Sequence, residues 1–371
     1  MFVEVRVLVL HGSFRILLLY DVAEAIDLAK LGEVLGARAV PAKGALPRRT
    51  PDYIRFERPP IVEAVDCVTV SAGQQAVCAI KYYAFGVVAL QYDVPFEATW
   101  ESIVAQAVRW MEPDDLEPHS REIARGSLNR IAPAVTRPTK EWLQEEYLVI
   151  NVQKMEEAGE ERHPTAAEML STHGPAIAQM IRGDLSPLSP QTTAKLLESH
   201  MSYYPTDLVV AGASAAFVYD RSEDAEATNQ VLEYAKVQLL EFRYYDGLMT
   251  RLLSEIYAAL ERKRNFLFSR WSLPRDAQRF NTIRLDVMEL TERIDNAIKF
   301  VSDIYYARLY ELAAARIGVP EYRTLVDEKL RTAGELYDSM IDQFHDSRSF
   351  VLEVAVAILA VLDVLLLFAG K

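Results

Sequence analysis

The stretch FRILLLYDVAEAIDLAKLGEVLG, residues 14–36, predicts the fold class. Residues 14–20 form an apolar run with the length of a strand. From residue 21 onward, apolar side chains recur at the three- and four-residue spacing of an amphipathic helix, and Gly36 can end that helix. A strand followed directly by a helix is typical of a mixed α and β domain.

The segments that follow continue this pattern to about residue 155. Residues 53–70 and 75–93 are rich in β-branched and aromatic residues, and SAGQQ between them predicts a turn. Residues 95–111 have the spacing of an amphipathic helix, and residues 145–155 return to a strand pattern. The order strand, helix, strands, helix, strand predicts an α+β sheet domain over residues 1–155 that contains a ferredoxin-like layer.

The next segment, residues 156–221, is polar and interrupted by loops. It contains two candidate helices, TAAEMLSTHGPAIAQMIRG and SPQTTAKLLESH, the first of which we expect to break near Gly174 and Pro175. One further strand is expected over residues 208–219, with a kink at Gly212.

Residues 222–348 change in character and predict three long helices. Apolar residues in each helix alternate between spacings of three and four, as in a heptad repeat. In the first helix these residues are Leu239, Phe242, Met249, Leu253, Ile256 and Leu260, with Asp246 among them. In the second they are Ile283, Val287, Leu290, Ile294, Ala297, Val301 and Ile304. In the third they are Val326, Leu330, Ala333, Tyr337, Met340 and Phe344. This pattern predicts a long antiparallel helical hairpin or coiled coil.

The chain ends with FVLEVAVAILAVLDVLLLFAGK, residues 350–371, in which Glu353 and Asp363 interrupt an aliphatic run. A helix of 20 residues rises about 30 Å, which matches the hydrocarbon thickness of a bilayer. We therefore expect residues 349–371 to form a single-pass C-terminal membrane anchor that contacts lipid through residues 350–369. The alternative is a core helix of a soluble oligomer, because a fully buried helix can also be apolar all round.

Composition limits the compartment and the partners. The net charge of −13 repels phosphate backbones, so nucleic acid is a disfavoured partner. Cys67 and Cys78 are too few for a disulfide framework. Glu4, Arg6 and Arg15 interrupt the apolar start of the chain, which therefore lacks the order of a secretory signal. We expect the N-terminal bulk of the protein to lie in the cytoplasm.

No stretch predicts a catalytic residue, a cofactor site or a metal site. Phosphate-binding loops, dinucleotide fingerprints, nucleophile elbows and zinc-protease motifs are missing from the sequence. His163 and His173 are ten residues apart, whereas helical metal sites use spacings of three or four. The acidic stretch MEPDDLEPHSRE lacks the spacing of a calcium loop, and a solvated loop is the expected structure.

The densest polar and aromatic cluster is LLEFRYYDGLM, residues 239–249. Arg243 can pair with Asp246 on the helix surface or reach an acid on a neighbouring helix, and Glu241 stands beside them. We predict an interaction network that consists of Glu241, Arg243, Asp246, Glu353 and Asp363 and that fixes helix register or oligomer contacts. An ordinary ion pair on the helix surface is the alternative.

The last part of the chain, residues 205–371, resembles the "required for meiotic nuclear division" family, a domain-of-unknown-function family with bacterial members. The resemblance rests on VVAGASAAFVYD, LLEFRYYDGLM and SFVLEVAVAILAVLDVLL. In the terminal helix, Leu352-Glu353 and Leu362-Asp363 match the family pattern, whereas Val354 stands where a tryptophan is usual. The resemblance implies a membrane-associated, oligomer-forming protein, with mitochondrial members that support translation of membrane proteins.

These observations favour a non-enzymatic, membrane-anchored scaffold that forms homo-oligomers through its long helices. One alternative is a soluble oligomeric enzyme with an inter-domain site, whose sign is a deep pocket with convergent charges around residues 203–246. A second alternative is an RNA-associated adaptor that supports translation of membrane proteins, for which RKRNFLFSRW, residues 262–271, supplies a basic and aromatic patch. The sequence does not indicate a small-molecule ligand.

Overall fold

The structure, a computed structural model, describes residues 8–41, 59–70, 74–221, 225–262 and 304–336, together with positions 282, 285 and 288. The chain divides into two compact units. The first consists of Met1–Tyr244 and Thr291–Tyr322, and the second consists of Tyr245–Leu290 and Arg323–Lys371.

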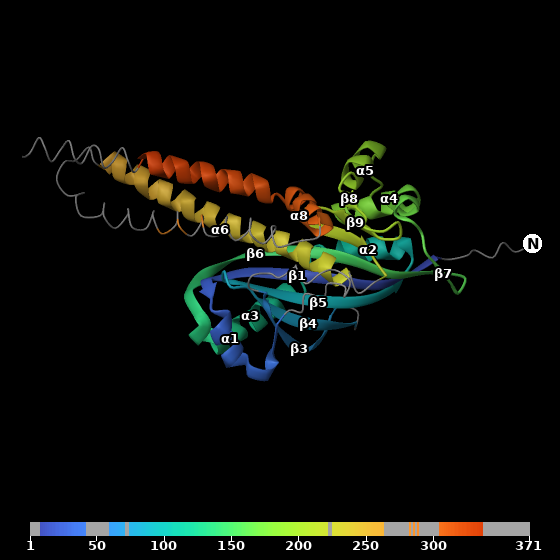
Figure 1. The fold of residues 1–371 in the computed structure, drawn as a ribbon, viewed down its shortest axis with the longest axis horizontal. Helices are drawn as coiled ribbons and strands as arrows, with labels where there is room; N and C mark the ends of the chain where they lie inside the picture. The colour runs from blue at the N-terminus through green and yellow to red at the C-terminus, as the bar shows by residue number, and fades with distance from the viewer. Residues whose placement is uncertain are drawn as a thin grey trace, which may run out of the picture. The chain divides into compact units, whose positions relative to one another are not determined.

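The first unit is built on one large sheet (Figure 1). Its strands are β1 (Leu8–Ile26), β2 (Ala39–Pro41), β3 (Ile61–Thr69), β4 (Gln75–Tyr82), β5 (Val87–Ala98), β6 (Val135–Glu157), β7 (Glu160–Arg162), β8 (His200–Met201), β9 (Leu208–Ala211) and β10 (Ala215–Tyr219). The order across the sheet is β2-β3-β4-β5-β1-β6-β10-β9-β8, with β7 beside β6. Neighbouring strands are antiparallel except β10 and β6, which are parallel.

Helices accompany this sheet, so the predicted α+β class is confirmed. They are α1 (Leu28–Leu35), α2 (Trp100–Trp110), α3 (Glu117–Ile131), α4 (Ala166–Arg182), α5 (Pro190–Leu197), α6 (Ala225–Arg262) and α8 (Ile304–Ile317), and residues 319–336 are also helical. In Figure 1, α1 and α3 lie on one side of the sheet and the first half of α6 lies on the other.

The face that carries α1 and α3 holds the main apolar core. Alternate residues of β1, including Phe14, Ile16 and Leu18, point into this core because side chains along a strand alternate between the two faces. Ser120 and Ser127 of α3 lie two turns apart and hydrogen-bond the buried hydroxyls of Tyr20 and Tyr82. Ser120 thereby supplies a partner for the buried Tyr20 hydroxyl, whereas the Tyr82 hydroxyl also donates to Glu63 at 2.6 Å.

The helix predicted to begin at residue 21 begins seven residues later, at Leu28. Strand β1 continues to Ile26, and α1 begins at Leu28 after Asp27, whose carboxylate accepts the backbone N–H groups of Ala29 at 3.0 Å and Lys30 at 3.2 Å. The positions of Val22 and Ile26 fit the spacing of a helix as well as that of a strand. The pairing of β1 with β6, which continues to Ile26, decides in favour of the strand.

Five other predictions about individual elements are also wrong. The predicted helix 95–111 begins only at Trp100, because β5 continues to Ala98. The run 75–93 divides into β4 and β5, and the run 208–219 divides into β9 and β10 around Gly212. Helix α4 continues through Pro175 instead of breaking there, and the acidic stretch predicted as a loop contains the start of α3.

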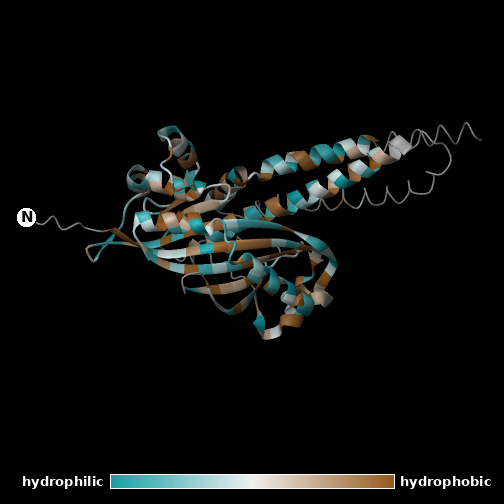
Figure 2. Cartoon of the chain, turned by 180° about the vertical axis from the view of Figure 1, so that it is seen from behind, coloured by the Kyte–Doolittle hydropathy of each residue, from teal (hydrophilic) through white to brown (hydrophobic). Residues whose placement is uncertain are grey.

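The second unit contains the C-terminal part of α6 and residues 323–336. Along α6, Met249, Leu252 and Ile256 are buried, and Val326 and Ala333 are buried on the other helical segment. Figure 2 shows apolar and polar residues alternating along α6, as expected for a helix that packs on one side. Most of the predicted central helix, and residues beyond 336, lie outside the described residues.

The predicted anchor over residues 349–371 also lies outside the described residues, together with Glu353 and Asp363. Within the part of the chain that the structure describes, no helix combines the length and apolar character that crossing a bilayer requires.

The turn between β4 and β5 yields a first prediction. Gly86 has a φ of +92°, and a Cβ atom there would lie 1.7 Å from the backbone oxygen of Ala23. We expect Gly86→Ala to lower the free energy of unfolding by roughly 2–4 kcal/mol in urea denaturation. Gly126→Ala in α3 is the control, because its Cβ would meet nothing within 4 Å. The control should raise stability by about 0.5–1 kcal/mol; equal losses in both variants would contradict the prediction.

Candidate functional site

The first half of α6 places charged side chains against the sheet face opposite the main core. Glu226, Glu233, Lys236 and Arg243 are separated by seven, three and seven residues, so they share one side of the helix. Each forms an ion pair with a residue of the sheet. These contacts form three groups along α6, which we call the α6 ion pairs.

The first group is centred on Arg15 of β1. Its guanidinium contacts Asp93 of β5 at 2.8 Å and Glu226 of α6 at 2.8 Å. Gln91 donates a hydrogen bond to the same Asp93 carboxylate. Burial alone would lower the pKa of Arg15, but the two carboxylates outweigh that effect and raise it. Arg15 is therefore a fixed cation that joins two strands to the start of α6.

The second group is centred on Glu233, which is 1% exposed. Its carboxylate pairs with the Lys81 ammonium and accepts a hydrogen bond of 2.7 Å from the Tyr83 hydroxyl. Burial and the adjacent Glu233 carboxylate raise the pKa of Tyr83 well above its usual value. The Tyr83 hydroxyl therefore stays protonated and acts as a donor to the carboxylate.

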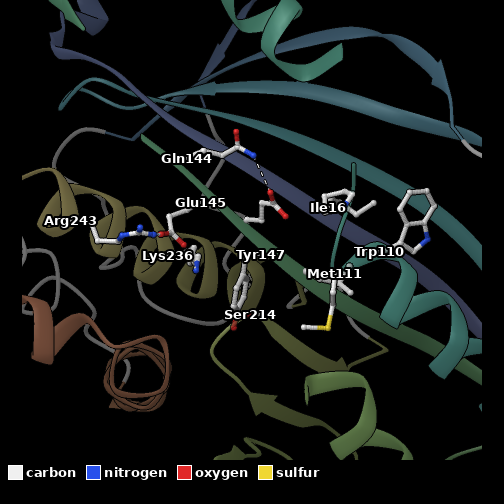
Figure 3. Close-up of a pocket in the computed structure, with 12 residues that line it drawn as sticks. Ile16, Trp110, Met111, Gln144, Glu145, Tyr147, Ser214, Lys236 and Arg243 are labelled. Atoms are coloured by element: carbon white, nitrogen blue, oxygen red, sulfur yellow. Dashed lines mark hydrogen bonds and ion pairs between the residues drawn. The ribbon is translucent and has the colours of Figure 1, made fainter. Parts of the chain in front are cut away.

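The third group is centred on Glu145 of β6. Lys236 Nζ lies 2.6 Å from Glu145 Oε2, and Arg243 contacts the other carboxylate oxygen. Lys236 Nζ also lies 5.9 Å from the centroid of the Tyr147 ring. Figure 3 shows Lys236 and Arg243 pointing toward Glu145 from α6, with Tyr147 beside Lys236. Two cations here share a single direct carboxylate partner.

A cavity of about 270 Å³ adjoins this third group. Its polar lining comes from Gln144, Glu145, Glu146, Ser214, Lys236 and Arg243, and its less polar lining comes from Ile16, Trp110, Met111, Pro113, Tyr147 and Leu148. In Figure 3, Ile16, Trp110 and Met111 lie across β6 from Lys236 and Arg243. The cavity therefore reaches both faces of the sheet around an edge of β6.

The edge is open because β10 covers only part of β6. Pairing between these strands begins at Ala215 and Leu148, and the Leu148 N–H donates to the Ser214 carbonyl at 3.1 Å. Backbone groups along a strand point alternately to its two neighbours, so those of Glu146 and Gln144 point to the same side as those of Leu148. Among the described residues, no strand pairs with this edge of β6 before Leu148. Backbone donors and acceptors therefore line the cavity beside charged side chains.

Two side chains that line the cavity, Lys236 and Glu146, have pKa values that are shifted in the direction that favours their neutral forms. Burial lowers the pKa of Lys236 to about 8, and the nearby Glu146 carboxylate opposes that fall. Burial also raises the pKa of Glu146, with further contributions from the carboxylates of Glu117 and Asp114, while a 3.0 Å hydrogen bond from Gln144 opposes the rise. Perturbed groups that line a cavity are typical of ligand and catalytic sites.

The structure separates the residues of the predicted interaction network. Arg243 pairs with Glu145 of a strand rather than with Asp246 or an acid on a neighbouring helix. Asp246 belongs to the second unit, where it pairs with Lys329. Glu241 is buried, at 3% exposure. A contact between these residues and Glu353 or Asp363 stays a prediction, because both acids lie outside the described residues.

Sequence reasoning did not identify Glu145 and Lys236 as members of the site. They are far apart in sequence, and neither belongs to the cluster LLEFRYYDGLM. The stronger signal came from Arg15 within FRILLLY and Lys81 within CAIKYY, because a cation inside an apolar strand run requires a buried partner. Those two residues could have shown that a charged element packs on this face of the sheet.

Metal binding has no candidate in the part of the chain that the structure describes. No three His, Cys, Asp or Glu side chains converge there into a group that could hold a metal ion. His173 instead stacks on Trp100, with ring centroids 4.2 Å apart.

Comparison with known proteins gives one family. A family model described as "Uncharacterized protein MJ0711, N-terminal domain" matches residues 11–226, more than half of the chain. A curated protein from Methanocaldococcus jannaschii, "Uncharacterized protein MJ0711", is 21% identical over 193 residues, which cover 52% of this chain and 59% of that protein. No solved structure matches. The description supports the expectation of a domain of unknown function, and it says nothing about meiotic nuclear division.

The second group of α6 ion pairs, centred on Glu233, yields a stability prediction. Glu233→Leu leaves the Lys81 ammonium buried without its carboxylate, so we expect a loss of about 3–5 kcal/mol in the free energy of unfolding. The triple variant Lys81→Met, Tyr83→Phe and Glu233→Leu removes all three polar groups together. It should unfold within about 1–2 kcal/mol of the parent protein in urea. A triple variant as unstable as Glu233→Leu would contradict this account.

Asp21 yields a pH prediction. This residue of β1 is 2% exposed, and burial raises its pKa from 3.8 to about 7. The folded state therefore binds more protons than the unfolded state between about pH 4 and 7, so this group lowers stability progressively as the pH rises through that window. We expect Asp21→Asn to raise the free energy of unfolding by roughly 1–3 kcal/mol at pH 8 and by much less at pH 4.

The control for Asp21→Asn is Asp327→Asn, which changes an exposed carboxylate. Urea denaturation at both pH values should show no comparable difference for this control. A stability gain at Asp21 that is equal at pH 4 and pH 8 would contradict the assigned titration.

Proposed function

We propose a function for this chain, which belongs to the family described as the N-terminal domain of uncharacterized protein MJ0711. The proposed function is that of a non-enzymatic scaffold. In this proposal it forms homo-oligomers through its long helices. Residues 350–369 hold it at a membrane as a single-pass C-terminal anchor, and its N-terminal bulk lies in the cytoplasm.

The observation that carries the proposal is the continuity of α6. This helix extends for 38 residues and contributes to both compact units. Its first half is fixed to the sheet by the α6 ion pairs, so the helix has a defined position on its own domain. A long helix anchored in this way is suited to present its remaining turns to partner helices.

Features within the second unit support helix partners. Asp246 pairs with Lys329, whose ammonium also donates to Thr250 at 2.7 Å. Tyr257, Leu285 and Met288 are large apolar residues with exposures of 48%, 65% and 57%. These side chains are available to pack against another chain if partner helices bring them together. The resemblance of residues 205–371 to the membrane-associated family named above supports the same function.

Two finer features of the fold belong to this proposal. The strands β4-β5-β1-β6, connected through α1 and through α2 and α3, have the order of a ferredoxin-like layer, and we propose that they form one. We also propose that the heptad-bearing helices of residues 222–348 form a coiled coil, with Asp246 as the polar residue that sets register.

The second candidate function is an enzyme, and the cavity beside Lys236 favours it. Ser214, Lys236 and Arg243, which lie within the range 203–246 named for a possible site, line the cavity together with Glu145 and Glu146, which lie outside that range. Every lining residue belongs to the first unit, so this cavity differs from the inter-domain site expected for such an enzyme.

Alkaline carbonate extraction tests the scaffold proposal. We expect full-length protein in the membrane pellet and protein stopped after Ser347 in the supernatant, because the aliphatic run is the proposed anchor. Light scattering on the truncated protein should give a mass of at least two chains. Extraction of both forms into the supernatant would eliminate the anchor, and a monomeric mass would eliminate oligomer formation through residues 222–347.

A further inference from the structure

We propose that the cavity beside β6 binds a small 2-oxo acid and that Lys236 forms an imine with its carbonyl carbon. This inference goes beyond the scaffold function, and it would give the second candidate function a substrate class. It rests on the positions of Lys236, Glu145 and Arg243 around the cavity.

The position of Lys236 is the first argument. Its side chain is 6% exposed, and it is one of the residues that line the cavity of about 270 Å³. Solvent is therefore largely excluded from the amine, while a small molecule in the cavity can reach it. Lys81 is a natural comparison, because its side chain is also buried and paired with a glutamate but does not line this cavity.

Proton transfer is the second argument. An ammonium must lose a proton before its nitrogen can attack a carbonyl carbon, and Glu145 Oε2 lies 2.6 Å from Lys236 Nζ. The neutral amine then adds to the carbonyl carbon to give a carbinolamine. Loss of one water molecule from the carbinolamine gives the imine, so the overall step converts amine and ketone into imine and water.

The electrostatic surroundings of Lys236 favour this reaction near neutral pH. Glu145 and Tyr147 face the amine from β6, and Arg243 is on its own helix. Glu146 points to the other face of the strand and acts on Lys236 through its charge. Burial lowers the pKa of Lys236 to about 8. Burial thereby favours the neutral amine, and the Glu145 carboxylate beside it can accept the proton that the ammonium loses. Buried lysines of this kind are typical nucleophiles toward carbonyl compounds.

The recognition of a carboxylate is the third argument. The Arg243 side chain is 40% exposed, and its planar guanidinium has five donors, so contact with Glu145 leaves donors for a ligand. Ile16, Trp110 and Met111 supply an apolar wall for the remaining part of the ligand. The volume of the cavity fits a compound of a few carbon atoms rather than a large cofactor.

Reductive trapping tests the imine. Full-length protein is incubated with pyruvate and sodium cyanoborohydride, and the adducts are located by peptide mass mapping. We expect one reduced adduct per chain, at Lys236, that forms at least tenfold faster than adducts at Lys81 or at the exposed Lys30 and Lys154. The rate should rise with pH up to about 8. Lys236→Arg keeps the cation beside Glu145 and should abolish the adduct.

A second comparison tests carboxylate recognition. Propanal has a carbonyl group but no carboxylate, so Arg243→Gln should slow trapping of pyruvate at least tenfold and leave trapping of propanal nearly unchanged. Equal effects on both compounds would overturn the assigned role of Arg243. Adducts spread evenly over exposed lysines, or no adduct at Lys236 in the parent protein, would overturn the imine itself. Membrane extraction and oligomer mass are independent of this result, so failure here leaves the scaffold proposal standing.

Discussion

Burial of charge between α6 and the sheet is the constraint on which the first unit depends. Removing a charge from water costs several kcal/mol, so each charge on this face requires a partner in a fixed place. Arg15, Lys81 and Glu145 supply those places on three different strands. A shift of α6 by one turn would separate all of these pairs together. The ion pairs therefore specify a single position for the helix more than they increase stability.

The two faces of the sheet are stabilised by different kinds of interaction. The face under α1 and α3 is held mainly by apolar packing, and its buried polar groups include the hydroxyls of Tyr20 and Tyr82 and the Glu63 carboxylate, which pairs with Arg130. The opposite face carries the α6 ion pairs, and its strand register sets their spacing. Lys81 and Glu145 lie in one row across the sheet, with Ala89 and Leu19 between them. Because these two residues separate Lys81 from Glu145, the two charged side chains do not pair with each other. Each forms its ion pair with a residue of α6 instead.

Much of the fold followed from local pattern, because strands and helices bury apolar residues at different periods. The pattern gave a wrong boundary where the apolar spacing fits a helix as well as a strand, as at Val22 and Ile26. Pairing with a neighbouring strand extended β1 to Ile26 and β5 to Ala98. It also failed at α3, where an acidic start concealed Ala124 and Ile131 on the buried side of a helix. Arg243 was found as a site residue, but Glu145 was not. Nearly a hundred residues separate them, and only the register of β6 brings them together.

The open edge of β6 also bears on how the protein behaves at high concentration. Between Val135 and Tyr147 no described strand covers that edge, which leaves backbone groups available to the edge of another molecule. The chain blunts most of this length through Pro138, which has no N–H to donate, the exposed charge of Lys140 and the positive φ of 46° at Arg137. Only the short stretch beside the cavity keeps a regular edge. That stretch, residues 144–147, is buried or half-buried and lines the cavity, so a ligand bound there would cover the part of the edge that these devices do not protect.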